Sequence, residues 1–298
     1  MENFILIVLA IFIGYLFSRL RIFPEESAAI LNQFVIFISL PAMILLQIPK
    51  LTLSMDIMIP VIIAWVVMTV SALLTLFVSH KLHFSQEVTG ALMLVAVLTN
   101  SSFLGIPVIS AYLGDEALPF ILVYDQMGTF LALATYGIFV AAYYSNKSEM
   151  SIGAMAVKVL TFPPFVSLII ALFFISTPFP EAISKVLASL ANTIVPIALV
   201  AVGLQLQLKL PGHEVQPFAI ALFIKLIIAP LIALGIVALA GWTNLAANVS
   251  VMEAGMAPMV TAGAMASLSG LAPRLSSAIV GYGILLSFLS TALLFKLL

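Results

Sequence analysis

The sequence predicts an all-α polytopic membrane protein of about ten transmembrane helices in two inverted five-helix repeats, with broken helices 4 and 9 that cross. Composition is the first observation: the 298 residues are 63% hydrophobic and 8% charged, with a mean hydropathy of +1.27. Soluble domains are about half apolar and about one quarter charged. The second observation is a series of ten long apolar runs, and the third is a set of proline motifs that recurs in both halves. So few charges cannot cover a soluble surface, so the apolar runs belong in a bilayer.

A membrane-spanning helix needs about 20 largely apolar residues. Short polar connections divide the chain into runs of this length, and no segment outside them is long enough for a second domain. The ten predicted spans are roughly residues 3–18, 27–48, 57–79, 88–113, 118–144, 155–176, 182–206, 217–241, 246–270 and 275–297.

Composition also excludes several classes of function. The chain has no cysteine, which removes disulfides, thiolate chemistry and Cys-ligated metals. A net charge of -1 and a pI of about 6.3 argue against nucleic acid as a partner. Its three histidines, His80, His83 and His213, all fall in predicted loops, and neither H-E-x-x-H nor G-x-S-x-G occurs. An intramembrane hydrolase is therefore only a remote alternative, and we expect no enzyme activity and no cofactor beyond a coupling ion.

Lysine and arginine positions predict the orientation in the membrane. The loops on one side of a ten-span topology carry Arg19, Arg21, Lys81, Lys147, Lys158, Lys209 and Arg274. The side that holds both termini carries Lys50, Lys185 and Lys296. Because positive loops face the cytoplasm, both termini are predicted to lie outside it.

An internal repeat follows from the number of spans and from paired motifs. Five spans per half force the second half, residues 153–298, to insert upside down relative to the first, residues 1–146. Pro41 and Pro196 lie 155 positions apart, and Pro107 and Pro258 lie 151 apart. Near-constant spacing is expected of a diverged duplication, and inverted repeats are typical of transporters.

Two spans, 88–113 and 246–270, carry helix-breaking residues beside polar ones. Gly105 and Pro107, and Gly255 and Pro258, fall near the middle of these spans. A break there must face protein or a water-filled cavity, because lipid cannot satisfy freed backbone groups. Pro107 and Pro258 suit the start of a second half-helix. Two helix starts that meet at the midplane would form a cradle for an anion; the alternative is that these residues merely kink the helices.

Several motifs in the same order resemble the auxin efflux carrier family. The stretch from Asn100 to Pro107 resembles the N-x-x-F-x-G-x-P element of that family, and Met256-Ala-Pro-Met with Thr261-Ala-Gly resembles its ninth-helix element. The segment 194–205 resembles P-x-A-L-x-x-x-G-x-x-L, and Lys225, five residues before Pro230, resembles the eighth helix. The resemblance covers nearly the whole chain.

The resemblance implies a fold shared with bile acid/sodium symporters. A scaffold would come from spans 1, 2, 6 and 7, and a core from spans 3–5 and 8–10, in which spans 4 and 9 cross. The chain lacks the long central hydrophilic loop of the plant carriers and looks like a bacterial-type member. Such members are associated with small carboxylates such as malate and malonate. The resemblance also implies a homodimer in the plasma (inner) membrane, with lipid and a small organic anion as its partners.

Three ionisable residues, Asp125, Lys225 and Glu253, fall well inside predicted spans. Each costs about 2.5–3.5 kcal/mol at a helix centre, so each should face the protein interior. Glu253 lies five residues before Pro258 and is either an ion or proton site or a carboxyl that caps freed N–H groups. Asp125, predicted nearer the outer end of its span, is a cation ligand, a gate residue or an interfacial acid. Lys225 either extends toward the interface, contacts substrate or pairs with one of the acids.

These residues predict anion transport coupled to a cation. One surplus carboxylate beside an anion site would repel the substrate, and H⁺ or Na⁺ bound there would remove that repulsion. The symporter resemblance implies Na⁺ ligands at Glu253, Asn100 and Ser101, whereas a proton would need Glu253 alone. Asp125 is a further ion-coupling candidate, and an uncoupled uniporter or an anion channel remains an alternative. The predicted substrate-binding residues are Asn100, Ser101, Ser102, Gly105, Pro107, Gly255, Pro258, Thr261 and Lys225.

Overall fold

The computed structural model of the chain describes residues 2–24, 26–50, 55–145, 157, 160–175, 177, 179–206 and 214–298. Every regular element in these ranges is helical, and the one β-type pairing in them is an isolated antiparallel bridge. Lys147, Lys158 and Lys209, which contribute to the predicted orientation, lie outside the described residues. So do His213 and residues 146 and 153, where the first predicted repeat ends and the second begins.

The elements of the first half match its five predicted spans in order. Three of these spans are single or nearly continuous helical runs, one is interrupted, and one contains two stretches of π-helix. The elements are α1 (Glu2–Leu20), α2 (Ser27–Phe34), η1 (Val35–Ser39), α3 (Leu40–Gln47), η2 (Ile48–Lys50), η3 (Met55–Ile57), α4 (Met58–Lys81), α5 (Gln86–Val95), η4 (Ser101–Gly105), α6 (Ile106–Leu113), η5 (Asp115–Ala117), α7 (Leu118–Val123), η6 (Tyr124–Phe130), η7 (Leu133–Gly137) and α8 (Ile138–Ser145).

The described elements of the second half follow the same order. They are α10 (Pro163–Leu172), α11 (Glu181–Ala191), α12 (Ile194–Gln205), α13 (Val215–Phe223), η8 (Ile224–Ile228), α14 (Ala229–Ala240), α15 (Leu245–Ala254), α16 (Val260–Leu268) and α17 (Pro273–Leu297). Among the described residues, 6 helical runs are long and apolar enough to cross a membrane by themselves: 27–50, 55–81, 115–145, 181–205, 215–240 and 273–297. The chain is therefore an all-α multi-pass membrane protein.

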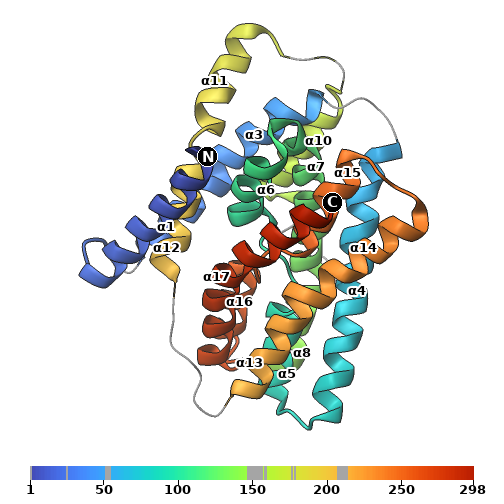
Figure 1. Cartoon of the computed structure of the whole chain (residues 1–298). Coiled ribbons are helices and arrows are strands. Elements are labelled where there is room, and N and C mark those ends of the chain that lie inside the picture. The colour runs from blue at the N-terminus through green and yellow to red at the C-terminus, as the bar shows by residue number, and fades with distance from the viewer. Residues whose placement is uncertain are drawn as a thin grey trace.

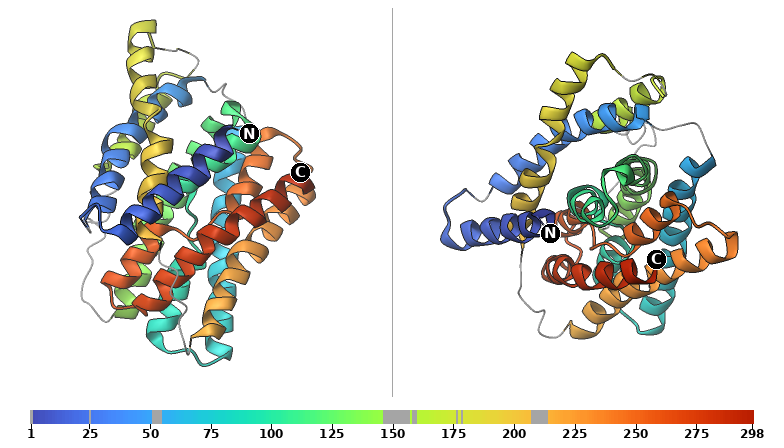
Figure 2. Two further views of the ribbon diagram at one scale, coloured as in Figure 1. Left: turned by 60° about the vertical axis from the view of Figure 1, so that its left-hand side comes forward. Right: turned by 45° about the horizontal axis from the view of Figure 1, so that its top comes forward.

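The helices pack in two groups (Figure 1). The first bundle, as we call it, contains α1–α3 and α10–α12, and its helices pair α1 with α12, α2 with α12, and α3 with α10 and α11. The second bundle contains α4–α8 and α13–α17. Figure 2 shows the same division from two further sides, with the N and C labels near each other in both views.

A close backbone contact joins α1 to α12. A Cβ built on Gly14 would collide with the carbonyl oxygen of Val200, and a Cβ built on Gly203 would collide with that of Ile11. The built Cβ of each glycine would also lie 3.0 Å from the Cα of the other. Small residues allow membrane helices to approach this closely. Nearby, the hydroxyls of Ser39 and Thr193 share a hydrogen bond of 2.7 Å.

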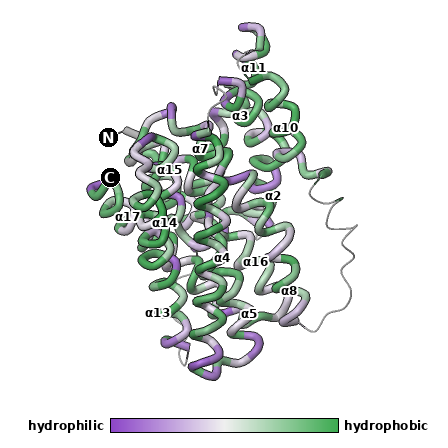
Figure 3. Tube along the Cα trace, turned by 90° about the vertical axis from the view of Figure 1, so that its right-hand side faces the viewer, coloured by the Kyte–Doolittle hydropathy of each residue, from purple (hydrophilic) through white to green (hydrophobic). Residues whose placement is uncertain are grey.

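The outer surface has the polarity expected of a membrane protein. Figure 3 shows hydrophobic colour along α4, with hydrophilic residues gathered toward the ends of the molecule. On α4, Leu73 and Phe77 are each 64% exposed, while Ser71 and Thr75 face the interior and are fully buried. This inversion, with apolar side chains outside and hydroxyls inside, is what a lipid environment requires.

In the part of the chain that the structure describes, five stretches of π-helix interrupt the α-helices: η1, η4, η6, η7 and η8. A π-helical turn is rare and concentrates at functional sites, because its extra residue loosens the regular hydrogen-bond ladder. Three of the five carry the polar residues singled out in the sequence: Ser101 and Ser102 in η4, Asp125 in η6 and Lys225 in η8. Three of the five irregular stretches therefore coincide with the polar residues that the sequence analysis selected.

Candidate functional site

Two unwound segments meet in the second bundle. The helix α5 ends at Val95 and η4 begins at Ser101, while α15 ends at Ala254 and α16 begins at Val260. The two gaps, residues 96–100 and 255–259, run antiparallel and form the bridge between Thr99 and Pro258. We call this arrangement the crossing. Its backbone is completely interior, since residues 96–100 and 255–259 are all buried.

The unwound backbones of the crossing satisfy one another. The amide of Asn100 donates to the carbonyl of Ala257 at 2.9 Å, and the amide of Met259 donates to the carbonyl of Leu98 at 3.0 Å. Pro258 has no N–H to contribute, so the two bonds fall on either side of it. Irregular backbone can persist at membrane depth only where protein or water replaces the lost bonds. Here the partner strand replaces part of them.

The first break lies earlier in the chain than predicted. The sequence suggested an interruption near Gly105 and Pro107, but the backbone is already π-helical from Ser101 to Gly105, and Pro107 lies in the first turn of α6. The break is instead at residues 96–100, where the chain pairs with the other strand. The second break coincides with Gly255 and Pro258 as predicted, although α16 begins only at Val260.

Asp125 lies at the crossing. The sequence placed it nearer the outer end of its span, whereas the structure buries it to 1% exposure against the start of η4. Its Oδ1 accepts hydrogen bonds from the hydroxyls of Ser101 and Ser102, both at 2.5 Å, and its Oδ2 accepts one from Gln126 at 2.6 Å. This burial excludes the interpretation of Asp125 as an interfacial acid. The hydroxyls of Ser101 and Ser102, which were predicted to bind substrate, donate hydrogen bonds to Asp125 instead.

Lys225 joins η8 to the first unwound segment and to the end of α15. It is fully buried, and its Nζ donates to Thr99 Oγ1 at 2.5 Å and to the carbonyl of Ala254 at 3.2 Å. The lysine therefore does not extend to the membrane surface. Ala254 is the last residue of α15, where the helix dipole is negative, so a cation is favourable there. Among the described residues, the one ion pair is the exposed Lys185–Glu181 contact, so neither intramembrane acid pairs with Lys225.

Glu253 is the least satisfied group of the site. It is fully buried, and neither of its carboxylate oxygens has a hydrogen-bond partner. The carboxylate lies against Gly105, where an added Cβ would come within 2.7 and 2.8 Å of Oε1 and Oε2. Asp125 and Lys225 both lie close enough to act on its charge. Gly105 thus makes room for Glu253 rather than for an open cradle.

Two further buried polar atoms, Asn100 Nδ2 and Gln126 Oε1, also have no partner. Buried polar groups are nearly always hydrogen-bonded, to protein, water or a ligand. A donor and several acceptor oxygens around one crossing can therefore hold an ion or a polar substrate. Glu253 and Gln126 supply hard oxygens of the kind Na⁺ takes, while Ser101 is already bonded to Asp125. The described residues contain no cluster of three or more His, Cys, Asp or Glu, the usual ligands of a transition metal.

Gly255 and Pro258 pack on α17. A Cβ on Gly255 would collide with Leu294, and its carbonyl accepts a hydrogen bond from Ser290 at 3.1 Å. Pro258 fills the space left by Gly283, where an added Cβ would collide with the proline ring. Both residues therefore hold the crossing against α17. Two other residues that were predicted to bind substrate, Pro107 and Thr261, lie outside the crossing, in α6 and α16.

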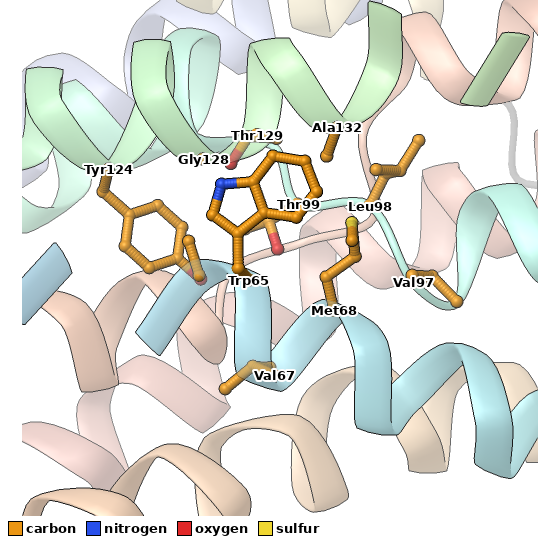
Figure 4. A pocket seen from close by; sticks show the side chains of 11 residues that line it. Trp65, Val67, Met68, Val97, Leu98, Thr99, Tyr124, Gly128, Thr129 and Ala132 are labelled. Carbon is orange, nitrogen blue, oxygen red and sulfur yellow. The ribbon is translucent and has the colours of Figure 1, made fainter. Parts of the chain in front are cut away.

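A small pocket adjoins the crossing (Figure 4). Its volume of about 10 Å³ gives room for roughly one water molecule. Trp65 of α4, Thr99 of the unwound segment and Tyr124 and Thr129 of η6 line it, and Figure 4 shows their side chains gathered around it. The indole of Trp65 donates to the carbonyl of Met127 at 2.9 Å and so ties α4 to η6.

Sequence reasoning missed several of these residues. Thr99, the partner of Lys225, directly precedes the recognised Asn100, and Gln126 directly follows Asp125, so their neighbours offered a signal. Tyr124, buried to 2%, and Ser290 offered none, because a tyrosine or serine in an apolar helix is usually a packing residue.

Broken helices that cross inside a multi-pass membrane protein are typical of one class of protein, the membrane transporters. The chain belongs to the family of membrane transport proteins that the sequence motifs resembled, the auxin efflux carrier family. The family model, described as "Membrane transport protein", matches residues 1–295.

Two archaeal relatives match almost end to end. A protein of Methanothermobacter thermautotrophicus, described as an "Uncharacterized transporter", is 25% identical over 295 residues, which cover 98% of this chain and 96% of the relative. A second protein so described, from Methanocaldococcus jannaschii, is 30% identical over 265 residues, or 86% of this chain and 85% of the relative. The chain is a membrane transporter of this family.

Proposed function

We propose that the protein is a secondary transporter that moves a small organic anion of the carboxylate class by an elevator-type alternating-access mechanism. The crossing is the observation that carries this proposal. Two helices interrupted at the same depth, paired through their backbones and braced by a buried lysine, resemble the midplane binding sites of transporters. Half-helix starts at Ser101 and Val260 offer N–H groups and positive dipole ends to an anion.

The two bundles suit the two parts of an elevator. In this proposal the first bundle, spans 1, 2, 6 and 7, is the scaffold, and the second bundle, spans 3–5 and 8–10, is the core that carries the substrate. The close α1–α12 contact at Gly14 and Gly203 supports a rigid scaffold. The proposed inverted repeats, 1–146 and 153–298, would each contribute one broken helix to the core.

Coupling would act through Glu253. Ionised and without a partner, this carboxylate repels an anion at the crossing; neutralised by H⁺ or Na⁺, it permits the anion to bind. The effect is a difference in substrate affinity between the ion-bound and ion-free states and is therefore reciprocal. Flux through a potential-driven uniporter or a channel would depend on neither pH nor Na⁺.

Counterflow into proteoliposomes tests the proposal. Vesicles loaded with unlabelled malonate or malate should take up labelled substrate faster than empty vesicles, and uptake should saturate. Organic cations should not compete, because the site presents helix starts to its ligand. Non-saturable flux that internal substrate does not stimulate would indicate a channel, and competition by amines as strong as that by carboxylates would contradict the anion site.

Orientation and assembly are part of the proposal. We expect a plasma (inner) membrane protein with both termini outside the cytoplasm, as a homodimer. A reporter active only in the cytoplasm should be silent at the carboxyl terminus, and crosslinking in native membranes should yield a dimer. Strong activity of that reporter at the carboxyl terminus would contradict the proposed orientation.

A further inference from the structure

Three buried hydroxyls follow one face of α4. Ser71, Thr75 and Ser79 are spaced four residues apart and are 0%, 0% and 1% exposed. None of their hydroxyl oxygens has a hydrogen-bond partner. This is unusual, because a serine or threonine inside a helix commonly bonds the carbonyl four residues earlier. Thr69 of the same helix does so, donating to Trp65 at 2.7 Å.

The hydroxyl line lies between two pockets that residues of α4 help to line. At one end, Ser79 lines a cavity of about 340 Å³ together with His80, His83, Thr89 and Tyr144. At the other end, Val67 and Met68, one turn before Ser71, line the small pocket beside the crossing. Thr99 and Tyr124 line that same pocket, and Tyr124 lies close enough to Glu253 for the two groups to interact electrostatically.

The spacing fits water-bridged hydrogen bonds. Residues four apart on a helix have Cβ atoms about 5–6 Å apart. One water between two such hydroxyls is within hydrogen-bond distance of both. Buried hydroxyls without protein partners are the groups that interior waters bond. A chain of hydroxyls and waters can pass a proton, since each oxygen accepts one proton and gives up another.

We infer that Ser71, Thr75 and Ser79 form a proton path from the His80–His83 cavity to Glu253. This inference rests on the proposed coupling role of Glu253. A proton from bulk water enters at the cavity, whose lining includes the imidazoles of His80 and His83 and the phenol of Tyr144. At each step one O–H bond breaks as another forms, so every hydroxyl ends unchanged. The proton finally bonds a carboxylate oxygen of Glu253, whose charged and titratable neighbours are Tyr124, Asp125 and Lys225.

Size and ligand number favour a proton over Na⁺ on this path. Single hydroxyls one turn apart offer an ion one protein oxygen at a time, whereas Na⁺ needs several at once. The pocket next to the crossing has room for roughly one water molecule and cannot pass a hydrated cation. A proton needs only an unbroken series of hydrogen bonds.

Thr75→Val tests the path, because it replaces the central hydroxyl by a methyl group of the same size. In proteoliposomes with a pH-sensitive dye inside, malonate-driven proton entry should fall about tenfold, the cost of one hydrogen bond lost at a barrier. Malonate counterflow, which needs no net proton movement, should stay unchanged. Thr75→Ser should restore proton entry. Thr69→Val is the matched control on the outer face of α4 and should resemble the parent.

The outcomes separate this inference from the proposed function. Normal proton entry in Thr75→Val, or an equal loss in Thr69→Val, overturns the path. Malonate counterflow by the parent without any proton entry, including flux driven by Na⁺, also overturns it and leaves anion transport standing. Absence of carboxylate counterflow in the parent contradicts the proposed function itself.

Discussion

Two of the contacts between helices from the two halves of the chain are made by opposite means: the α1–α12 contact and the crossing. At the α1–α12 contact, two glycines let regular helices touch backbone to backbone without any charged group. At the crossing, two helices unwind, pair as strands and gather Asp125, Lys225 and Glu253. The first solution makes a rigid joint, whereas the second leaves polar groups available for a ligand. In the proposed function, the first contact belongs to the scaffold and the second to the binding site.

The largest effect should come from filling the α1–α12 contact. In Gly203→Leu, the new side chain would collide with the carbonyl of Ile11 and lie 2.9 Å from the amide of Tyr15. Backbone atoms cannot move aside as a side chain can, so we expect a loss of about 3 kcal/mol and failure to purify as a single species. Size-exclusion chromatography and thermal melting in detergent measure this.

Gly235→Leu is the matched control, because nothing lies within 4 Å of a Cβ added there. Its melting temperature should stay close to that of the parent. If Gly203→Leu behaved like Gly235→Leu, the α1–α12 contact would not be the rigid joint described above.

The second effect concerns the lysine of the crossing. Lys225→Met leaves the Thr99 hydroxyl and the Ala254 carbonyl without their donor, which should cost about 1.5–3 kcal/mol and abolish counterflow. Lys185→Met removes a lysine from an exposed pair whose side chains are 76% and 82% exposed. That control should change stability by about 0.5 kcal/mol or less. Equal effects of the two variants on stability and transport would show that Lys225 has no special role at the crossing.

The third effect tests the contact between Gly105 and Glu253. Gly105→Ala would push the Glu253 carboxylate aside and should cost about 1–3 kcal/mol. In a Glu253→Ala background the same methyl group has room, so its cost should fall, and the two changes should be strongly non-additive. Thermal melting of the four proteins closes this cycle. Strict additivity would show that the two residues do not touch in the membrane.

The smallest effect on stability, and the sharpest on coupling, is expected for Glu253→Gln. The amide has the shape of a protonated carboxyl and no charge, so substrate counterflow should continue. In a proton-coupled carrier uptake should lose its pH dependence, and in a sodium-coupled one it should lose its Na⁺ dependence. Counterflow and net uptake, measured across pH with and without Na⁺, distinguish these cases. Net uptake by the parent that responds to neither ion would make Glu253 structural.

Much of the fold and part of the site could be predicted from the sequence. The described helices follow the predicted spans, apart from a few residues at their ends, because apolar run length and a few helix-breaking residues are local properties. The interruption at Gly255 and Pro258 was predicted for the same reason. Asn100, Ser101, Asp125, Lys225 and Glu253 stood out because polar residues are costly in apolar helices.

The sequence by itself determined the class of this protein: an all-α membrane chain with broken helices and three intramembrane charges. Only the tertiary structure decided which buried polar groups have hydrogen-bond partners. It moved the first break to residues 96–100, because strand pairing with the other segment, not Pro107, sets its position. It brought Asp125 to the crossing, gave Lys225 two acceptors and left Glu253 and the α4 hydroxyls without any. Hydrogen-bond partners come from helices far apart in the chain, and no local pattern specifies them.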